Sequence, residues 1–456
     1  MTKKILLISP PVISTKGARD INPYPPLGLA YLAATLKLDG HDIVILDCFL
    51  KGIDYEYPIN EKEIRIGLDI YSILSEIEKF KPDYIGITNQ FSRQRNIVYK
   101  ILKNIKIHFP DIVTVVGGAH PSASEDIYDN FPTFVVMGEG EKAVRDIVNG
   151  AYEKKDVTQI VLAGKNQILD MLPFPDWKTA NLKDYFGSPM SHGYRKHERF
   201  APVQTSRGCT AMCVFCSAHK VYGRKFRARS AADVIMELIN LKTNYDIQEI
   251  MFEDDNLTLD PKRAEQIFYM MTDEKLNFKW DTPNGIAIWT LSERLIDKMV
   301  ESGCHTINFP LESGSQRVLR EVIRKPINLK RAKELIRYAK TTGVNVGLFL
   351  VVGIPGETKK EIEQTLRLGH ELGIYFPHIS IATPYPGTKL AKLFEHNPQY
   401  NFNYNDLHIR KANISTHEWS ADELIKMLKW NRYERIARSF INEPIKTYEK
   451  YRRSKQ

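Results

Sequence analysis

The sequence contains few cysteines and no long apolar run, and both shortages limit what the protein can be. Five cysteines occur in 456 residues, an odd and sparse set that argues against the disulfide framework of a secreted protein. A membrane-spanning helix is not expected, because no stretch of about 18 apolar residues is present. The first apolar run stops at Ser9-Pro10-Pro11, which is too early for the core of a signal peptide. We therefore expect a cytoplasmic protein.

Acidic residues are fewer than basic ones. Lys and Arg number 64 against 55 Asp and Glu, which gives a net charge of +9 and an isoelectric point near 9.0. A basic chain can bind nucleic acid, but part of this excess lies in the last 30 residues, which form no recognisable nucleic-acid-binding motif. A solvated tail is the simpler interpretation, and nucleic acid is not an expected partner.

The first part of the chain alternates short apolar segments with amphipathic ones. Continuous Ile/Val runs are typical of parallel strands that are buried on both faces. The predicted strands are 5–8, 43–46, 84–88, 113–116 and 134–137, and the clearest helices are 27–38 and 96–108. Five such units predict a doubly wound, flavodoxin-like (Rossmann-type) α/β domain over residues 1–150, which binds ligands outside the carboxyl ends of its strands. Residues 151–198 contain helix-breaking prolines and are predicted to form a linker.

A second alternation of strands and helices follows. The predicted strands are 201–205, 249–252, 285–288, 306–309, 347–351 and 378–382, and the clearest helices are 232–241, 292–301 and 329–341. Six such units predict a partial (β/α)6 barrel over residues 199–395, with functional residues at the carboxyl ends of its strands. Residues 396–456 are predicted to form a small, mostly helical C-terminal region.

Three of the five cysteines, Cys209, Cys213 and Cys216, fall within eight residues just after a predicted strand. Three thiolates on one loop can bind three irons of a cubane cluster and leave the fourth iron open, as a catalytic site requires. A structural zinc site with His219 as fourth ligand is an alternative, but no second cysteine pair is present. Inert buried thiols are another alternative, and the polar neighbours argue against them. Cys48 and Cys304 are predicted to be buried structural thiols.

The segment from Thr205 to Cys216, on a six-unit barrel, resembles the radical S-adenosylmethionine (SAM) superfamily. The resemblance implies a [4Fe–4S] cluster on Cys209, Cys213 and Cys216, which cleaves SAM reductively to a 5′-deoxyadenosyl radical. It implies that Phe215 lies beside the adenine and that acidic residues after the second strand bind the methionine amino group. The implied SAM-binding residues are Phe215, Glu253, Asp254, Asp255, Glu312, Ser313 and Gly353.

The N-terminal domain adds a second resemblance. The segments Pro25–Ala34, Val116–Pro121 and Gly138–Glu141 are similar to the cobalamin-binding domain of cobalamin-dependent radical enzymes. The implied cobalamin-binding residues are Ser9, Pro10, Leu27, Gly28, Asn89, Gln90, Ser92, Gly117, Gly118, His120, Gly138 and Glu139. The Asp-x-His-x-x-Gly motif that ligates cobalt in methionine-synthase-type domains is absent, so we expect cobalamin to bind without a histidine below the metal. A domain that binds no corrin is the alternative.

Together the two resemblances imply a cobalamin-dependent radical SAM methyltransferase. It would methylate an unactivated carbon of a small molecule, or of a natural-product, cofactor or lipid precursor, with methyl from methylcobalamin. Flavodoxin or ferredoxin would supply electrons. Three alternatives are an oxidative cyclase resembling the anaerobic magnesium-protoporphyrin ester cyclase, a non-catalytic cobalamin sensor or carrier, and a methylthiotransferase acting on transfer RNA. The last fits poorly, because it would need three more N-terminal cysteines and only Cys48 is there.

Overall fold

The computed structural model describes residues 2–17, 21–124, 128–164, 168–188, 195–394 and 404–442, together with residues 444, 447 and 448. The chain forms two compact units. Met1–Thr210, Ser217–Asp255 and Met270–Pro283 make up the first, and Ala211–Cys216, Asn256–Tyr269 and Asn284–Gln456 make up the second. Among the described residues, no helix combines the length and the apolar character needed to cross a bilayer.

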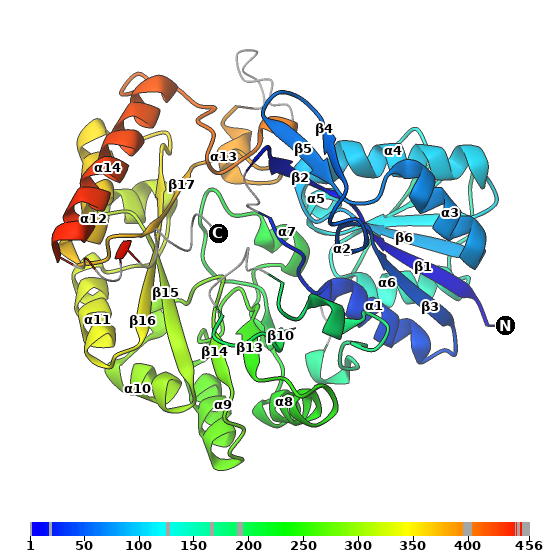
Figure 1. Cartoon of the computed structure of the whole chain (residues 1–456), viewed down its shortest axis with the longest axis horizontal. Helices are drawn as coiled ribbons and strands as arrows, with labels where there is room; N and C mark the ends of the chain where they lie inside the picture. The colour runs from blue at the N-terminus through cyan, green and yellow to red at the C-terminus, as the bar shows by residue number, and fades with distance from the viewer. Residues whose placement is uncertain are drawn as a thin grey trace. The chain divides into compact units, whose positions relative to one another are not determined.

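Six parallel strands form the N-terminal sheet, in the order β3-β1-β6-β7-β8-β9 (Figure 1). Their bounds are β1 (Lys4–Ser9), β3 (Asp42–Asp47), β6 (Tyr84–Thr88), β7 (Val113–Gly117), β8 (Phe134–Met137) and β9 (Gln159–Leu162). The first five are the strands that the apolar runs predict, and their order is flavodoxin-like. Because β9 pairs in parallel with β8, the sheet extends into the predicted linker. The boundary at residue 150 itself stays a prediction.

Helices cover both faces of this sheet, as the continuous apolar runs require (Figure 1). On one face, Ile5 and Leu7 of β1 pack with α1 (Leu27–Lys37) and α6 (Gly140–Val148). On the other, Leu6 and Ile8 pack with α3 (Ile70–Phe80) and α4 (Arg95–His108). Successive side chains of a strand point to opposite faces, so one run of four apolar residues serves both cores.

Several short elements of this half were not predicted. They are an antiparallel sheet in the order β2-β5-β4, with β2 (Val12–Thr15), β4 (Glu56–Pro58) and β5 (Glu63–Ile66), and the helical turns α2 (Cys48–Lys51), η1 (Ser92–Gln94), α5 (Ala119–Ala123), η2 (Leu169–Met171) and η3 (Leu182–Tyr185). Elements of three to five residues show too little periodicity to be recognised in a sequence.

The predicted barrel strands occur as two parallel runs of three. In the first unit, β10 (Phe200–Val203), β13 (Glu249–Phe252) and β14 (Lys279–Asp281) pair in that order. In the second unit, β15 (Cys304–Glu312), β16 (Asn345–Val352) and β17 (His378–Ile381) pair in that order. The helices between successive strands are α8 (Ala231–Tyr245), α9 (Pro261–Asp273), α10 (Glu293–Glu301), α11 (Leu329–Thr341) and α12 (Lys359–Glu371).

Side-chain caps explain where four of these helices begin. Ser230, Ser292, Asn328 and Thr358 each accept a hydrogen bond from the backbone N–H three residues further on. Such a cap satisfies one of the N–H groups that the first helical turn leaves without a partner. Each cap therefore sets the place where a loop from a strand end turns into the next helix.

The prediction for the third barrel strand was wrong. It lies at Lys279–Asp281, not at 285–288. Residues Ile286–Ile288 are buried, but they lead into the 3-10 helix η4 (Ile288–Thr290), and Gly285 has a φ of +85°. A short apolar run marks burial without distinguishing a strand from a buried connection. Pro283 and Gly285 were the signals that the strand had already ended.

The C-terminal region contains α13 (Lys389–Lys392), the 3-10 helix η7 (Tyr404–Asp406) and α14 (Ala421–Asn442). The long helix agrees with the mostly helical region that the sequence predicts over residues 396–456. The basic residues after Tyr448 lie outside the described residues.

Candidate active site

The three clustered cysteines lie between β11 (Ser206–Arg207) and α7 (Ala218–Tyr222). All three thiols are half-buried, and none forms a disulfide. Within the described ranges, no three His, Cys, Asp or Glu side chains are arranged to hold a metal ion. The donor set nevertheless fits an iron–sulfur cluster, because soft thiolates are its usual ligands and three of them leave one iron open. Cys48 and Cys304 are buried, as predicted.

Backbone contacts hold this cysteine segment at two places. Gly208 has a φ of +88°, and a Cβ there would lie 2.4 Å from the Lys225 carbonyl oxygen, so only glycine fits. Further along, the Val214 N–H donates to the Ile323 carbonyl at 3.1 Å, and the Val214 carbonyl accepts from the Leu390 N–H at 2.9 Å. The neighbouring Phe215 is half-buried, and its adenine contact stays a prediction.

The acidic residues after β13 have different surroundings. Asp254 is buried and accepts from the Thr205 N–H at 3.1 Å, the Thr205 hydroxyl at 2.7 Å and the Ser206 hydroxyl. Glu253 accepts from the Tyr24 hydroxyl. These two carboxylates therefore fasten β10 and the N-terminal domain to the end of β13.

Asp255 is the carboxylate that remains available. The Gly208 N–H donates to it, but its buried Oδ2 has no hydrogen-bond partner. Burial, reinforced by the nearby Asp254 carboxylate, raises the pKa of Asp255 to about 6. An unsatisfied carboxyl oxygen of this kind is suited to a cationic ligand. The binding of the methionine amino group by Glu253, Asp254 or Asp255 stays a prediction.

The predicted residues at the ends of β15 and β16 lie in the second unit. Glu312 has a φ of 68°, a backbone conformation that is strained for a non-glycine residue, and its Oε1 accepts from Lys325 Nζ at 2.7 Å. The Ser313 hydroxyl lies 3.1 Å from the Thr365 hydroxyl of α12. Gly353 has a φ of +81°, and a Cβ there would lie 2.6 Å from Leu424 Cδ2.

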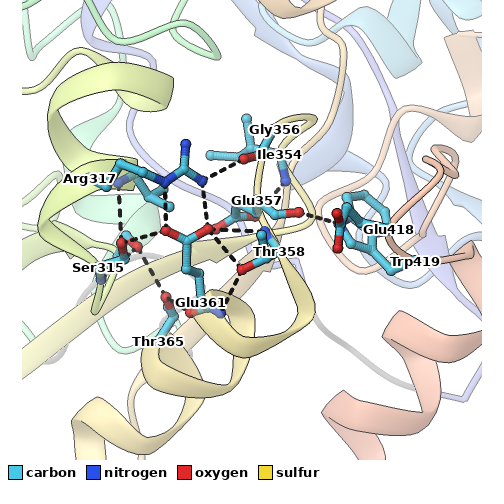
Figure 2. A network of polar contacts seen from close by, with 12 residues as sticks. Ser315, Arg317, Ile354, Gly356, Glu357, Thr358, Glu361, Thr365, Glu418 and Trp419 are labelled. Carbon is cyan, nitrogen blue, oxygen red and sulfur yellow. Dashed lines mark hydrogen bonds and ion pairs between the residues drawn. The ribbon is translucent and has the colours of Figure 1, made fainter.

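A polar network joins the loop after β15 to the start of α12 (Figure 2). Glu361 accepts from Arg317 through both carboxyl oxygens, at 2.9 and 2.6 Å, and from the Ser315 hydroxyl at 2.9 Å. Arg317 also donates to the Gly356 carbonyl at 2.7 Å. The hydrogen bonds from Arg317 lower the pKa of Glu361 to about 2. The Arg317–Glu361 ion pair therefore holds the loop after β15 against the loop between β16 and α12.

Glu357 lies in the same network, but its pKa is shifted in the opposite direction from that of Glu361. Its Oε2 accepts from the Ile354 N–H at 2.7 Å, while its buried Oε1 has no partner. Burial raises the pKa of Glu357 to about 8, despite the backbone N–H groups of Ile354 and Gly353. The Trp419 indole N–H donates to the Glu357 carbonyl at 3.0 Å, which ties the C-terminal region to this loop (Figure 2).

Predicted cobalamin-binding residues meet at the carboxyl ends of β6 and β7. The Asn89 carbonyl accepts from the His120 N–H at 3.1 Å, and a Cβ on Gly118 would lie 2.8 Å from that same carbonyl oxygen. Asn89 Nδ2 donates to the Tyr128 hydroxyl at 2.6 Å, whereas its buried Oδ1 has no partner. This free amide oxygen and the tight glycine turn fit a ligand that approaches the backbone closely.

Hydrogen bonds extend this cluster to Ser92 and to the end of β8. The Ser92 hydroxyl lies 3.1 Å from His120 Nδ1. The Ser122 hydroxyl donates to the Gly118 carbonyl at 2.7 Å and accepts from the Gly138 N–H at 2.9 Å. The structure therefore brings Asn89, Ser92, Gly117, Gly118, His120 and Gly138 into one connected edge of the sheet.

The remaining cobalamin candidates are less connected. Ser9 ends β1 and Pro10 follows it, while Leu27 and Gly28 open α1. Gly28 and Gln90 are exposed. Their contacts with cobalamin stay predictions.

Glu139 binds other protein groups. Its buried carboxylate pairs with Arg207 and Arg227, which sequence analysis did not single out. Lys325 and Glu357 were missed as well. The available signal was a charged residue inside an otherwise apolar or glycine-rich strand end, because such a charge must find a partner when buried.

Comparisons with known proteins identify the two domains. Residues 203–369 match the model of the Radical SAM superfamily, and residues 20–148 match that of the B12 binding domain. Cytidylyl-2-hydroxyethylphosphonate methyltransferase from Streptomyces wedmorensis is 33% identical over 86% of this chain and 81% of that protein. The anaerobic magnesium-protoporphyrin IX monomethyl ester cyclase of Rubrivivax gelatinosus is 25% identical over 85% of this chain and 69% of that protein.

A solved structure has the same fold. The radical SAM methyltransferase TsrM from Kitasatospora setae, with cobalamin and a [4Fe–4S] cluster bound, aligns with a TM-score of 0.66 at 15% identity. The alignment covers 85% of this chain and 77% of that one. The predicted fold class, a flavodoxin-like domain followed by a partial barrel, is confirmed.

Gly208→Ala should reduce iron binding. The added Cβ meets the Lys225 carbonyl at 2.4 Å on a backbone with φ of +88°, so the start of the cysteine segment must shift. We expect less iron and sulfide per chain after anaerobic reconstitution. Gly164→Ala is the control, because a Cβ there meets nothing within 4 Å. Equal iron content in the two variants would contradict the role assigned to Gly208.

Glu357→Gln should stabilise the protein at alkaline pH. Because burial raises the folded-state pKa from 4.5 to about 8, the fold prefers the protonated form, and stability falls as pH rises between these values. The neutral amide avoids this loss, which is on the order of 2–4 kcal/mol.

Urea midpoints at pH 6 and pH 9 test this expectation. The gap between Glu357→Gln and the wild type should widen at pH 9. Glu361→Gln is the matched control from the same network, and it should destabilise at both pH values because it breaks the Arg317 pair. A pH-independent gap for Glu357→Gln would be inconsistent with a protonated Glu357.

Proposed function

The chain belongs to the radical SAM enzymes that carry a B12-binding domain, and from this membership we propose that it methylates an unactivated carbon of a small molecule. One observation carries the proposal. Three half-buried thiols that form no disulfide follow a domain whose strand ends present an unsatisfied amide oxygen at Asn89. The chain therefore offers a donor set for each of the two cofactors that radical methylation needs.

We assign the SAM site to the residues around the cysteine segment. Cys209, Cys213 and Cys216 would hold a [4Fe–4S] cluster, which when bound supplies the electron that cleaves SAM. Asp255 is the group proposed for the methionine ammonium, since its Oδ2 lacks a partner and its N–H donor, Gly208, directly precedes Cys209. Phe215, Glu312 and Gly353 are proposed to line the rest of the site.

We assign the cobalamin site to the edge formed by Asn89, Gly118, His120 and Gly138. Cobalamin, when bound, supplies the methyl group for transfer. We propose that no histidine lies below the cobalt. Support comes from the sequence, which lacks the Asp-x-His-x-x-Gly motif of the cobalt-ligating domains. Asn89 then faces the ligand with an amide oxygen.

The substrate is proposed to be a small molecule, because two similar proteins are named for or bind one. One is a cytidylyl-2-hydroxyethylphosphonate methyltransferase, and TsrM was solved with tryptophan bound. An external electron donor of the flavodoxin or ferredoxin type is also proposed. The described residues contain no further cysteine cluster that would relay electrons within the chain.

Cys213→Ala should abolish SAM cleavage. The protein is reconstituted anaerobically with iron, sulfide, hydroxocobalamin and SAM that carries a deuterated methyl group, and 5′-deoxyadenosine is measured. Cys304→Ala is the control, because this thiol is buried outside the segment, and it should retain iron and cleavage. Unchanged cleavage by Cys213→Ala would contradict cleavage by a cluster on these cysteines. A wild type that binds cobalamin but cleaves no SAM would favour the cobalamin sensor or carrier.

Mass spectra of candidate products complete this test. The proposal predicts transfer of the deuterated methyl group to carbon. A product that gains oxygen or a ring without methyl would identify the oxidative cyclase alternative and contradict methyl transfer.

SAM binding should weaken as pH falls through about 6. Below its pKa of about 6, Asp255 is protonated and cannot attract an ammonium group, so the dissociation constant should rise by up to about tenfold per pH unit. Asp255→Asn should bind weakly without this pH dependence in equilibrium dialysis.

Asp260→Asn is the control for this measurement. Asp260 is exposed and caps α9 through the Arg263 N–H, and asparagine is an equally good cap. The control should keep both affinity and pH dependence. If Asp255→Asn kept them too, the methionine amino end would have to bind elsewhere.

A further inference from the structure

Arg207, which is buried, and Arg227, which is half-buried, join the proposed cobalamin-binding edge to the base of the cysteine segment. Arg207 lies on β11 and Arg227 lies opposite it on β12 (Arg227–Ala228), where the two strands pair antiparallel. This two-stranded ribbon encloses residues 208–226, which include all three clustered cysteines. Both arginines reach across to carboxylates of the N-terminal domain, and every partner lies in the first compact unit.

The carboxylates are Glu139, which precedes α6, and Glu141, in its first turn. Arg207 donates to Glu139 Oε2 at 3.0 Å and to Glu141 Oε1 at 2.6 Å. Arg227 donates to both oxygens of Glu139. The Glu139 side chain is 0% exposed and the Arg207 side chain is 5% exposed. Two positive and two negative charges thus lie together with their hydrogen bonds made.

The aromatic and amide groups around Arg207 hold it in one orientation. Its Nε donates to the Gln204 side chain at 3.0 Å. Tyr31 of α1 and Tyr222 of α7 each present a ring 5.5 Å from its guanidinium carbon. Because a guanidinium keeps its charge inside a protein, Arg207 cannot leave this position without breaking several interactions at once.

The other end of the path lies among the predicted cobalamin residues. Glu139 directly follows Gly138. The Gly138 N–H donates to the Ser122 hydroxyl, which in turn donates to the Gly118 carbonyl. In addition α5, which contains His120, packs against α7, the helix just after Cys216. A hydrogen-bonded route therefore runs from Gly118 through Gly138 and Glu139 to the base of the cysteine segment.

We propose that this arginine–glutamate cluster couples the two cofactor sites, so that cobalamin bound at the sheet edge favours the cluster-binding arrangement of the cysteine segment. The inference rests on the proposed function, because it presumes that both cofactors bind. Glu139, Arg207 and Arg227 are positioning residues in this account. Coupling between sites is reciprocal, so iron–sulfur loading must strengthen cobalamin binding by the same factor.

The test measures the dissociation constant of hydroxocobalamin by absorbance, for protein with and without a reconstituted cluster. We expect the wild type to bind about tenfold more tightly when loaded, within the usual range of allosteric coupling. The coupling is expressed as a ratio, the dissociation constant without the cluster divided by that with it. In Glu139→Gln this ratio should fall toward one. The ratio cancels any direct contact of Glu139 with cobalamin, because that contact is present in both states.

Two further variants serve as a control and as a replacement if the first variant is unstable. Arg145→Gln is the matched control on the same helix, because Arg145 pairs with Asp39 within the N-terminal domain, and it should keep the full ratio. If Glu139→Gln proves unstable, the double variant Glu139→Gln/Arg227→Gln removes one charge of each sign and leaves Arg207 paired with Glu141. The double variant should also show a ratio near one.

The outcomes separate the two claims. A wild type that binds cobalamin and cluster with a ratio of one would overturn the coupling alone. A full ratio in Glu139→Gln or in the double variant would do the same. A wild type that binds neither cofactor would overturn the proposed function, and the coupling with it.

Discussion

The buried charge of Arg207, together with the half-buried Arg227 beside it, is the constraint on which the site depends. A guanidinium group cannot be neutralised in a protein, so burial commits it to carboxylates. The only way to supply Glu139 and Glu141 is to hold the end of β8 against the ribbon that closes the cysteine segment. The N-terminal domain and the first strands of the barrel therefore belong to one compact unit, which also contains Gly208 and Cys209 at the start of the cysteine segment.

The second constraint is the geometry of parallel sheets, whose carboxyl ends gather loops at one edge. Most polar groups at these edges are committed to holding loops, as Asp254 holds Thr205 and Ser206. Among the described residues, the buried acceptors without a hydrogen-bond partner at these edges include Asn89 Oδ1, Asp255 Oδ2 and Glu357 Oε1. Unsatisfied buried acceptors are costly. For Asn89 and Asp255 the proposed ligands offset that cost, whereas Glu357 avoids it by holding a proton.

The sequence predicted the fold well because the parallel strands are continuous apolar runs, and β6, β8 and β13 have the predicted bounds. It failed at β14, where a buried apolar connection resembles a strand. The cysteine segment was recognised from spacing alone. The partners of the acidic residues could not be predicted from the sequence, because such pairs meet only after folding. Tyr24 and Glu253, for example, are 229 positions apart in the chain. A sequence can name candidate carboxylates, but contacts decide which one is free.

Mössbauer spectroscopy of the 57Fe-reconstituted protein tests the central claim, that three thiols hold a cluster with one iron open to SAM. The account predicts a [4Fe–4S] spectrum in which one iron site becomes distinct from the other three when SAM is added. A spectrum without a [4Fe–4S] component, or a cluster spectrum that SAM leaves unchanged, would contradict it.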